Sequence, residues 1–305
     1  MSNILKIGMQ FFASTVTANY ATQFEADLKQ KYTRELLTSG LTTNNVRFVN
    51  ANTIKIPYVI VGGYKDHSRA GGFNRQNLEN KWMTKTLDFD RDVEFFVDAM
   101  DVDETNQVLS AANITNTFVT EKAIPETDAY RISKLYADYV AAGGTADTTA
   151  LTAANILATF DAWMEQMDED EVPEEGRILY VTPAVYTLIK TADKIQRTLE
   201  VSGEKGIDRR VRSLDDITIQ KVPSGRMKTA YDFTDGYAPA EDAKQINMVM
   251  VHPSALVACD KHSYIRLWAP GSHTQGDGYL YQNRKYGDLF VLDTRIQGVK
   301  INVDA

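Results

Sequence analysis

The chain has 305 residues, 43% of them hydrophobic and 24% charged, which is enough for about two ordinary domains with a packed core and excludes bulk disorder. Its formal net charge of −8 disfavours a protein that grips nucleic acid by neutralising phosphates. No stretch approaches the roughly 18 apolar residues of a membrane span, and the N-terminus lacks a convincing signal peptide. The single cysteine, Cys259, cannot close an intrachain disulfide. We expect a soluble protein in a reducing compartment, without membrane contact.

The N-terminal segment combines an apolar start with an amphipathic pattern. After the extended residues 1–16, Tyr20, Phe24, Leu28 and Tyr32 recur every four residues, which predicts a helix that ends near Ser39 and Gly40. Such a helix packs on its own domain or lies as an arm on another subunit. The apolar run "ILKIGMQFF" favours the arm, because so apolar a terminus needs a surface to cover it.

Two strand-like runs flank a glycine-rich stretch. "NTIKIPYVIV" and "LDFDRDVEFFVD" alternate at period two, and Pro57 suits an edge strand. The stretch between them, "GGYKDHSRAGGFNR", has two glycine pairs for turns and lacks the spacing of a phosphate-binding loop. We therefore predict a long, glycine-tipped hairpin with a charged tip.

The sequence after the predicted hairpin predicts helices first and then a mixed α/β region. Helical patterns cover residues 101–113, then 125–144, where Gly143 and Gly144 end the helix, and then a stripe of apolar residues after a polar linker. "RILYVTPAVYTLIK" and "INMVMVHPSALVA" each predict a strand, a proline-started turn and a short helix, the first capped by Thr182. The C-terminal run returns to strand patterning. The apolar stripe that follows the polar linker comprises Ile156, Leu157, Phe160, Trp163, Met164 and Met167.

No motif points to catalysis, a cofactor or a metal. The chain lacks a G-x-S-x-G elbow and an H-E-x-x-H pair, and the surroundings of Cys259 match no nucleophile signature. His252, Cys259 and His262 offer too few ligands for structural zinc, and the acidic run 167–176 has no calcium-loop spacing. We expect no catalytic residue, no cofactor and no bound metal.

The order of the parts resembles the major capsid proteins of tailed bacteriophages, the Hong Kong 97 type fold. The similarity covers nearly the whole chain and lies in the order and spacing of its segments. It implies an α+β fold with four parts: an N-terminal arm (1–50), an extended hairpin loop (51–100), a peripheral domain with a spine helix (101–145 and 272–305) and an axial α/β domain (146–271).

The resemblance implies a structural protein. Copies would form hexamers and pentamers of an icosahedral head that encloses double-stranded DNA without reading its sequence, assembled in the host cytoplasm and located in the virion. A separate scaffolding protein and a portal protein are the expected partners, because about 50 residues before the first strand are too few for a built-in scaffold. Lys65, Lys81 and Lys85 lie in the segment that some members cross-link, but we expect non-covalent assembly.

Opposite charges suggest where copies would touch. Cations of the hairpin loop would pair with acids near the spine helix of a neighbour, and an arginine cluster would face neighbours within a capsomer. The loop residues are Lys65, Arg69, Arg75 and Lys81, the acids are Glu121, Glu126 and Asp128, and the cluster is Arg209, Arg210 and Arg212. Two alternatives remain open: the shell of an encapsulin-type nanocompartment, and a soluble α/β enzyme with a preformed pocket.

Overall fold

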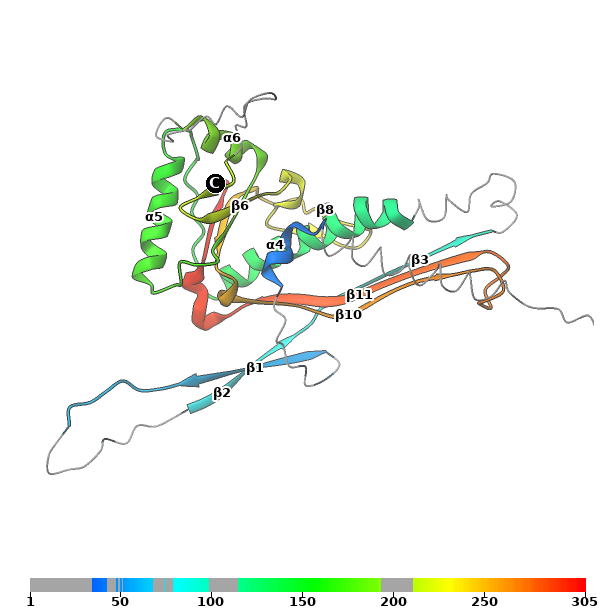
Figure 1. Ribbon diagram of the computed structural model, residues 1–305, viewed down its shortest axis with the longest axis horizontal. Coiled ribbons are helices and arrows are strands. Elements are labelled where there is room, and N and C mark those ends of the chain that lie inside the picture. The colour runs from blue at the N-terminus through cyan, green and yellow to red at the C-terminus, as the bar shows by residue number, and fades with distance from the viewer. Residues whose placement is uncertain are drawn as a thin grey trace, which may run out of the picture.

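The structure, a computed structural model, describes residues 35–42, 48, 50, 52–67, 74, 79–98, 115–192 and 211–305. It combines a helix-covered mixed sheet, a long three-stranded sheet and a projecting two-stranded ribbon (Figure 1). None of the described helices is long and apolar enough to cross a membrane. The predicted N-terminal helix up to residue 34 and the predicted helix over 101–113 lie outside the described residues.

The mixed sheet lies between helices on its two faces. Its order is β12 (Val299–Val303), β9 (Ile246–Val251), β4 (Ile178–Val181), β6 (Ile217–Lys221) and β5 (Ser213–Leu214), and only β4 and β6 are parallel. Alternate strand residues such as Leu179 and Met250 pack on α5 (Ile156–Glu169) and α6 (Pro183–Thr191), whereas Tyr180 and Val249 face the opposite way. The second face packs on the long helix α4 (Ile124–Ala141).

Of the four helix predictions that fall on described residues, three are confirmed. The stripe of α5 is buried or half-buried, Thr182 caps α6 by accepting a hydrogen bond from Val185 N, and Gly143 follows α4 with a φ of +94°. The second strand-and-helix unit differs, because β9 is followed only by the three-residue turn η4 (Pro253–Ala255) and then by a strand. His252 Nδ1 accepts a hydrogen bond from Ser254 N and closes this turn.

A turn of π-helix, η2 (Val119–Ala123), leads directly into α4. The N–H of Ile124 donates to the carbonyl of Val119, five residues back. Pro125 follows, and it lacks an N–H and would press its ring on the carbonyl four residues earlier in a regular α-helix. The wider turn removes that conflict, so the proline accounts for the π-turn.

Two long strands form the second sheet with a shorter one. β10 (Leu256–Trp268) pairs antiparallel with β11 (Tyr279–Val291), which pairs antiparallel with β3 (Phe89–Val97), so β10 and β3 are its edges. Tyr281, Phe95 and Leu267 share one face and pack with Val119 and Ile124 of the helical segment above. In Figure 1 this sheet runs out below α4 and away from the mixed sheet.

The ribbon corrects one prediction. β1 (Thr53–Ile60) pairs antiparallel with β2 (Glu79–Thr86), whereas the run around Phe89, which we expected as the second arm of the hairpin, belongs to the three-stranded sheet as β3. Both strands of a two-stranded ribbon are edges, as Pro57 requires. The remaining short elements are η1 (Leu37–Leu41), η3 (Ser224–Arg226), β7 (Tyr231–Asp232), β8 (Ala238–Pro239) and η5 (Asp293–Gly298).

Candidate functional site

The base of the ribbon is fixed to the three-stranded sheet. Ile54 is fully buried in a small cluster with Leu87, Cys259 and Phe290. An ion pair of 3.3 Å joins Lys85 to Asp293, and Lys261 Nζ donates to the carbonyl oxygen of Asn50 at 2.7 Å. These contacts fix only the base of the ribbon, so they set the direction in which the ribbon leaves the three-stranded sheet.

Beyond its base the ribbon exposes apolar side chains. Val59 and Trp82 are 54% and 56% exposed, and Tyr64 near the tip has no cover at all. Pro57 is paired with Trp82 and Lys55 with Thr84, which places Lys55, Val59 and Trp82 on one face of the ribbon. A two-stranded ribbon is only marginally stable alone in water, and an exposed tryptophan is a frequent anchor of protein interfaces. This face has the character of a contact surface.

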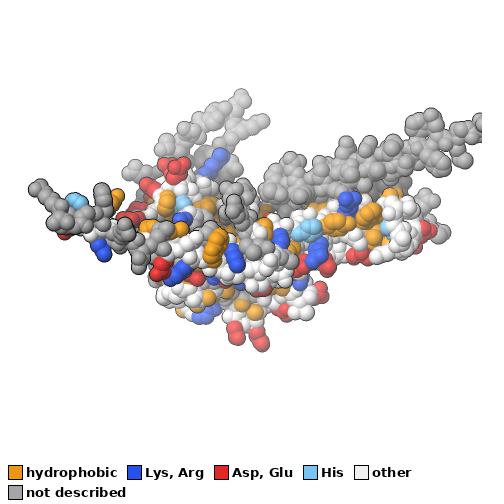
Figure 2. All heavy atoms as spheres, turned by 90° about the horizontal axis from the view of Figure 1, so that it is seen from below, with side chains coloured by type: hydrophobic (Ala, Val, Ile, Leu, Met, Phe, Trp, Pro, Cys, Tyr) orange, Lys and Arg blue, Asp and Glu red, His pale blue; other side chains and the backbone are white. Residues whose placement is uncertain are grey.

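The outer face of the three-stranded sheet carries an ordered row of charges. Asp90, Asp92 and Glu94 alternate along β3 and are exposed, and Phe96 takes the next outward position. Figure 2 views the molecule from this side, with acidic side chains along one rim and basic and hydrophobic ones further in. Arg284 of β11 pairs with Asp90 at 2.5 Å, and this guanidinium lowers the pKa of the Asp90 carboxyl.

A buried charge cluster fastens η1 to α4. The carboxylate of Asp128, which has no exposed surface, accepts hydrogen bonds from Thr38 N at 3.0 Å and Thr38 Oγ1 at 2.8 Å, and pairs with Arg226 at 3.3 Å. Arg131 donates to the Thr38 carbonyl and pairs with Asp260 at 3.2 Å. Burial raises the pKa of Asp128 despite these donors. Asp128 is therefore not a surface acid, and its predicted pairing with a neighbour does not fit this placement.

The other predicted contact residues have varied surroundings. Glu126 pairs with Arg91 of its own chain at 2.7 Å, Lys81 pairs with Glu79 at 2.9 Å, and Glu121 is exposed. Lys65 and Arg212 are also exposed. Their contact with a neighbour stays a prediction, as it does for the four that lie outside the described residues, Arg69, Arg75, Arg209 and Arg210.

Sequence reasoning missed the arginine that organises the acidic run. The side chain of Arg177 is fully buried and binds Asp168 at 2.6 Å, the carbonyl of Val172 at 2.6 Å and that of Pro173 at 3.0 Å. A single arginine after many acids gives no signal of burial in a sequence. The acidic run therefore forms a turn between α5 and β4 that the hydrogen bonds of Arg177 hold in place. Among the described residues, no group of three side chains is suited to binding a metal ion.

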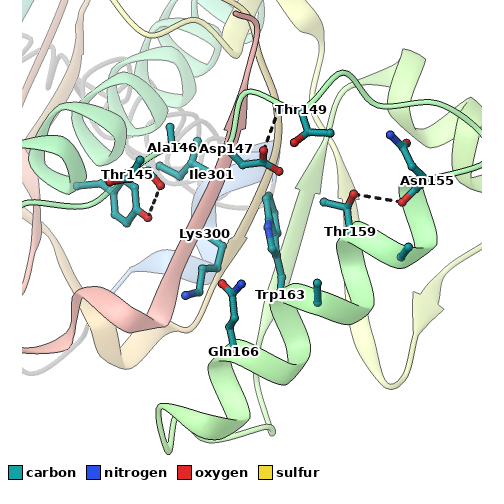
Figure 3. Close-up of a pocket in the computed structure, with 13 residues that line it drawn as sticks. Thr145, Ala146, Asp147, Thr149, Asn155, Thr159, Trp163, Gln166, Lys300 and Ile301 are labelled. Atoms are coloured by element: carbon teal, nitrogen blue, oxygen red, sulfur yellow. Dashed lines mark hydrogen bonds between the residues drawn. The ribbon is translucent and has the colours of Figure 1, made fainter.

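A pocket lies between α5, the linker after α4 and β12 (Figure 3). Its volume is about 480 Å³. The polar groups in it already serve local turns: Tyr139 donates to the Thr145 carbonyl, Asp147 accepts from Thr149 N, and Thr159 donates to the Asn155 carbonyl. These bonds stabilise the linker, so the pocket gives the enzyme alternative no nucleophile with an adjacent base.

The thiol of Cys259 is equally unsuited to nucleophilic chemistry. It is buried, and burial raises its pKa to about 11. The neutral thiol is a poor nucleophile, because the thiolate is the reactive form. Cys259 therefore packs as a small apolar residue at the base of the ribbon.

Comparison with solved structures finds capsid proteins. The mature capsid of bacteriophage PhiM1 matches with a TM-score of 0.61 and 17% identity, over 84% of this chain and 82% of that chain. The capsid of cyanophage P-SCSP1u matches with a TM-score of 0.59 and 15% identity, over 87% and 86%. A virus-like particle from Pyrococcus furiosus matches with a TM-score of 0.53 and 10% identity, over 93% and 99%. No family model and no curated protein matches the sequence.

The chain has the α+β fold of these capsid structures. The likeness covers more than four fifths of the chain in each of the three comparisons. At this level of identity it concerns the fold alone.

Proposed function

We propose that this chain is the major capsid protein of a tailed bacteriophage, of the Hong Kong 97 type. Copies form hexamers and pentamers that close into an icosahedral head around double-stranded DNA, with a separate scaffolding protein and a portal protein as partners. The protein assembles in the host cytoplasm and ends in the virion, where its role is structural and non-covalent. The observation that carries the proposal is the likeness to solved phage capsids over most of the chain.

The four parts follow the limits expected from the sequence, and strand pairing suggests changes to these limits at two strands. The arm (1–50), hairpin loop (51–100), peripheral domain (101–145 and 272–305) and axial domain (146–271) are useful units for experiments. β12 pairs with β9, which joins the C-terminal strand to the axial sheet, and β3 pairs with β11 of the peripheral region. The proposed limits of the loop and of the two domains therefore need adjustment at these strands.

A closed protein compartment that encloses cargo other than a viral genome is the second candidate. The observation that favours it is the match to the virus-like particle from Pyrococcus furiosus, which extends over 99% of that chain. The genes beside the coding sequence distinguish the two candidates. Terminase and portal genes would support a phage head, and the gene of a cargo enzyme would support a nanocompartment.

Sedimentation velocity with negative-stain microscopy tests the proposal. The full chain is purified alone and after co-expression with its neighbouring genes. We expect capsomers, shells or tubes built from repeating subunits. A compact monomer under both conditions would contradict a capsid role and return attention to the pocket beside α5.

A further inference from the structure

The three-stranded sheet has two edge strands that no further strand covers among the described residues. β10 and β3 lie on either side of β11 (Figure 1), and neither 262–268 nor 90–96 pairs with another strand there. An edge strand presents a row of N–H and C=O groups with which another strand can pair. Natural edges are often protected by proline or lysine, and neither residue type occurs in these two segments. Both edges are therefore suited to pairing.

A cavity of about 740 Å³ lies along the outer edge of β3. The strand residues 89–93 line it, together with Phe118 and the turn 234–236. Consecutive residues of a strand point to opposite faces of a sheet, so the cavity reaches around the edge of the strand. There is room beside β3 for the side chains of a further strand.

The outer faces of the two edge strands carry opposite charges. β10 presents the exposed cations His262 and Arg266, and β3 presents Asp90 and Glu94 in the same rows of the sheet. Glu94 accepts a hydrogen bond from the neutral amide of Gln282 at 2.7 Å, and the guanidinium of Arg266 lies 5.5 Å from the ring centre of Trp268. Two β3 edges would bring acids together and two β10 edges would bring arginines together, so charge favours pairing of unlike edges.

The inner faces match in the same register as the charges. When β10 of one copy runs parallel to β3 of another with Arg266 beside Glu94, half-buried apolar side chains meet on the inner face. A shift by one residue would turn them to the opposite face. A shift by two would place Arg266 beside Phe96 or beside Asp92, which already lies opposite Arg284. The apolar pairs are Ile265 with Val93 and Leu267 with Phe95.

We propose that β10 of one copy of this chain pairs in parallel with β3 of a second copy, with residues 262–268 beside residues 90–96, so that one sheet continues across both copies. The inference rests on the proposed shell-forming function and adds a contact between sheet edges to it. Main-chain hydrogen bonds supply affinity in such strand addition, and the side chains select the register. Because the two edges are different parts of one molecule, the contact is head-to-tail.

A disulfide tests the pairing in assembled particles. Adjacent strands lie about 4.8 Å apart, within the range of about 4.4–6.8 Å between Cα atoms that a disulfide bridges. Within one chain, Arg266 and Glu94 lie on opposite sides of Gln282, about 10 Å apart and beyond that range. We expect mild oxidation of Arg266→Cys/Glu94→Cys to give a ladder of covalent dimers, trimers and larger species on a denaturing gel. Each single variant gives no ladder, and native Cys259 is buried.

The register has its own control. Arg266→Cys/Asp90→Cys carries two cysteines on the same faces, but its second position is four residues, or about 13 Å, out of register. We expect no ladder from this variant. An equal ladder from both double variants would show that the cross-links come from random encounters and would overturn the inference.

An exchange of charges tests the same contact without a covalent bond. We expect Arg266→Glu and Glu94→Arg each to raise the protein concentration needed for assembly at least about tenfold at physiological salt, because like charges then meet at the interface. The variant with both changes recovers most of the loss. Lys244→Glu and Glu174→Arg, which make the same changes of charge at other exposed positions, assemble like the wild type. Circular dichroism establishes that each variant is folded.

The outcomes separate this contact from the proposed function. Shells of Arg266→Cys/Glu94→Cys that give no ladder overturn the contact and leave the shell-forming function intact. Charge variants that assemble at the wild-type concentration, or a double exchange without recovery, overturn it as well. A wild-type chain that never assembles overturns the proposed function, and the inference with it.

Discussion

Asp128 is the residue on which the attachment of η1 to α4 most depends. Its substitution by alanine leaves the N–H and hydroxyl of Thr38 and the guanidinium of Arg226 without their shared acceptor. Loss of one partner of a buried ion pair costs about 3–5 kcal/mol, so we expect the free energy of unfolding to fall by that amount. Urea denaturation of the dissociated chain measures it. The exposed Glu121→Ala is the control, and equal midpoints for the two variants would contradict the account.

Lys285 should leave a signature in the pH dependence of stability. Its ammonium group lies 3.6 Å from Asp260 and 3.4 Å from Thr127 Oγ1, and burial lowers its pKa from the ordinary 10.5 to about 8. Between these values the unfolded chain holds a proton that the folded chain has released, so stability rises with pH across this window. The contribution of one proton is at most about 1.4 kcal/mol per pH unit.

The variant Lys285→Met removes this titration. We expect the rise in the free energy of unfolding between pH 8 and 10.5 to be smaller in the variant than in the wild type, by the contribution of that one group. Lys55→Met, at an exposed lysine, keeps the full rise. Parallel wild-type and Lys285→Met profiles would show that Lys285 is not the group that titrates.

At the scale of elements, Ile54 decides whether the ribbon keeps its direction. Ile54→Ala removes buried methyl groups from the cluster with Cys259 and Phe290, and such truncations cost about 2–5 kcal/mol. We expect faster hydrogen exchange of the amides of β1 and β2 while those of α5 keep their protection. Val59→Ala, on the same strand at an exposed position, should leave exchange unchanged. Exchange that rises equally in α5 would indicate global unfolding instead.

Elements with a strong period were predictable and their partners were not. The helices α4 and α5 were predictable because apolar residues recur in them at helical spacing, although one apolar residue of α4, Val140, is 46% exposed. Period-two alternation identified β3 but could not say that it pairs with β11, almost 200 residues away. The strand β2 was missed because "ENKWMTKT" is exposed apart from half-buried Met83 and Lys85, and so lacks a hydrophobic alternation. Pairing is decided by the tertiary fold.

The same limit applies to the candidate contact residues. Because Asp128 is charged, we expected it at the surface of the protein. It is buried instead, since hydrogen-bond donors from η1 and η3 converge on its carboxylate. Arg177 and Arg131 are buried for the corresponding reason, with carboxylates and carbonyls around their guanidinium groups. Such burial depends on residues about 90 positions away in the case of Thr38 and Asp128, and no local pattern records it.

At the scale of the whole molecule, the body and the projecting ribbon should be separable. The body holds the large hydrophobic clusters of the mixed sheet and α4, whereas the ribbon beyond Ile56 contributes only exposed or half-buried side chains to the described structure. Stability should therefore reside in the body and assembly in the ribbon. A variant without the outer part of the ribbon distinguishes these two contributions.

Strand register gives the design of that variant. Ile60 is paired with Glu79, so an Asn-Gly turn in place of residues 61–78 closes the hairpin with a two-residue loop. We expect the free energy of unfolding of the dissociated chain to stay within about 0.5 kcal/mol of the wild type, because the described residues of the removed segment, 61–67 and 74, are exposed. Closed shells should be lost, since the tip with Lys65, Arg69 and Arg75 is gone. Calorimetry and negative-stain microscopy measure the two effects, and intact shells would show that the tip has no part in assembly.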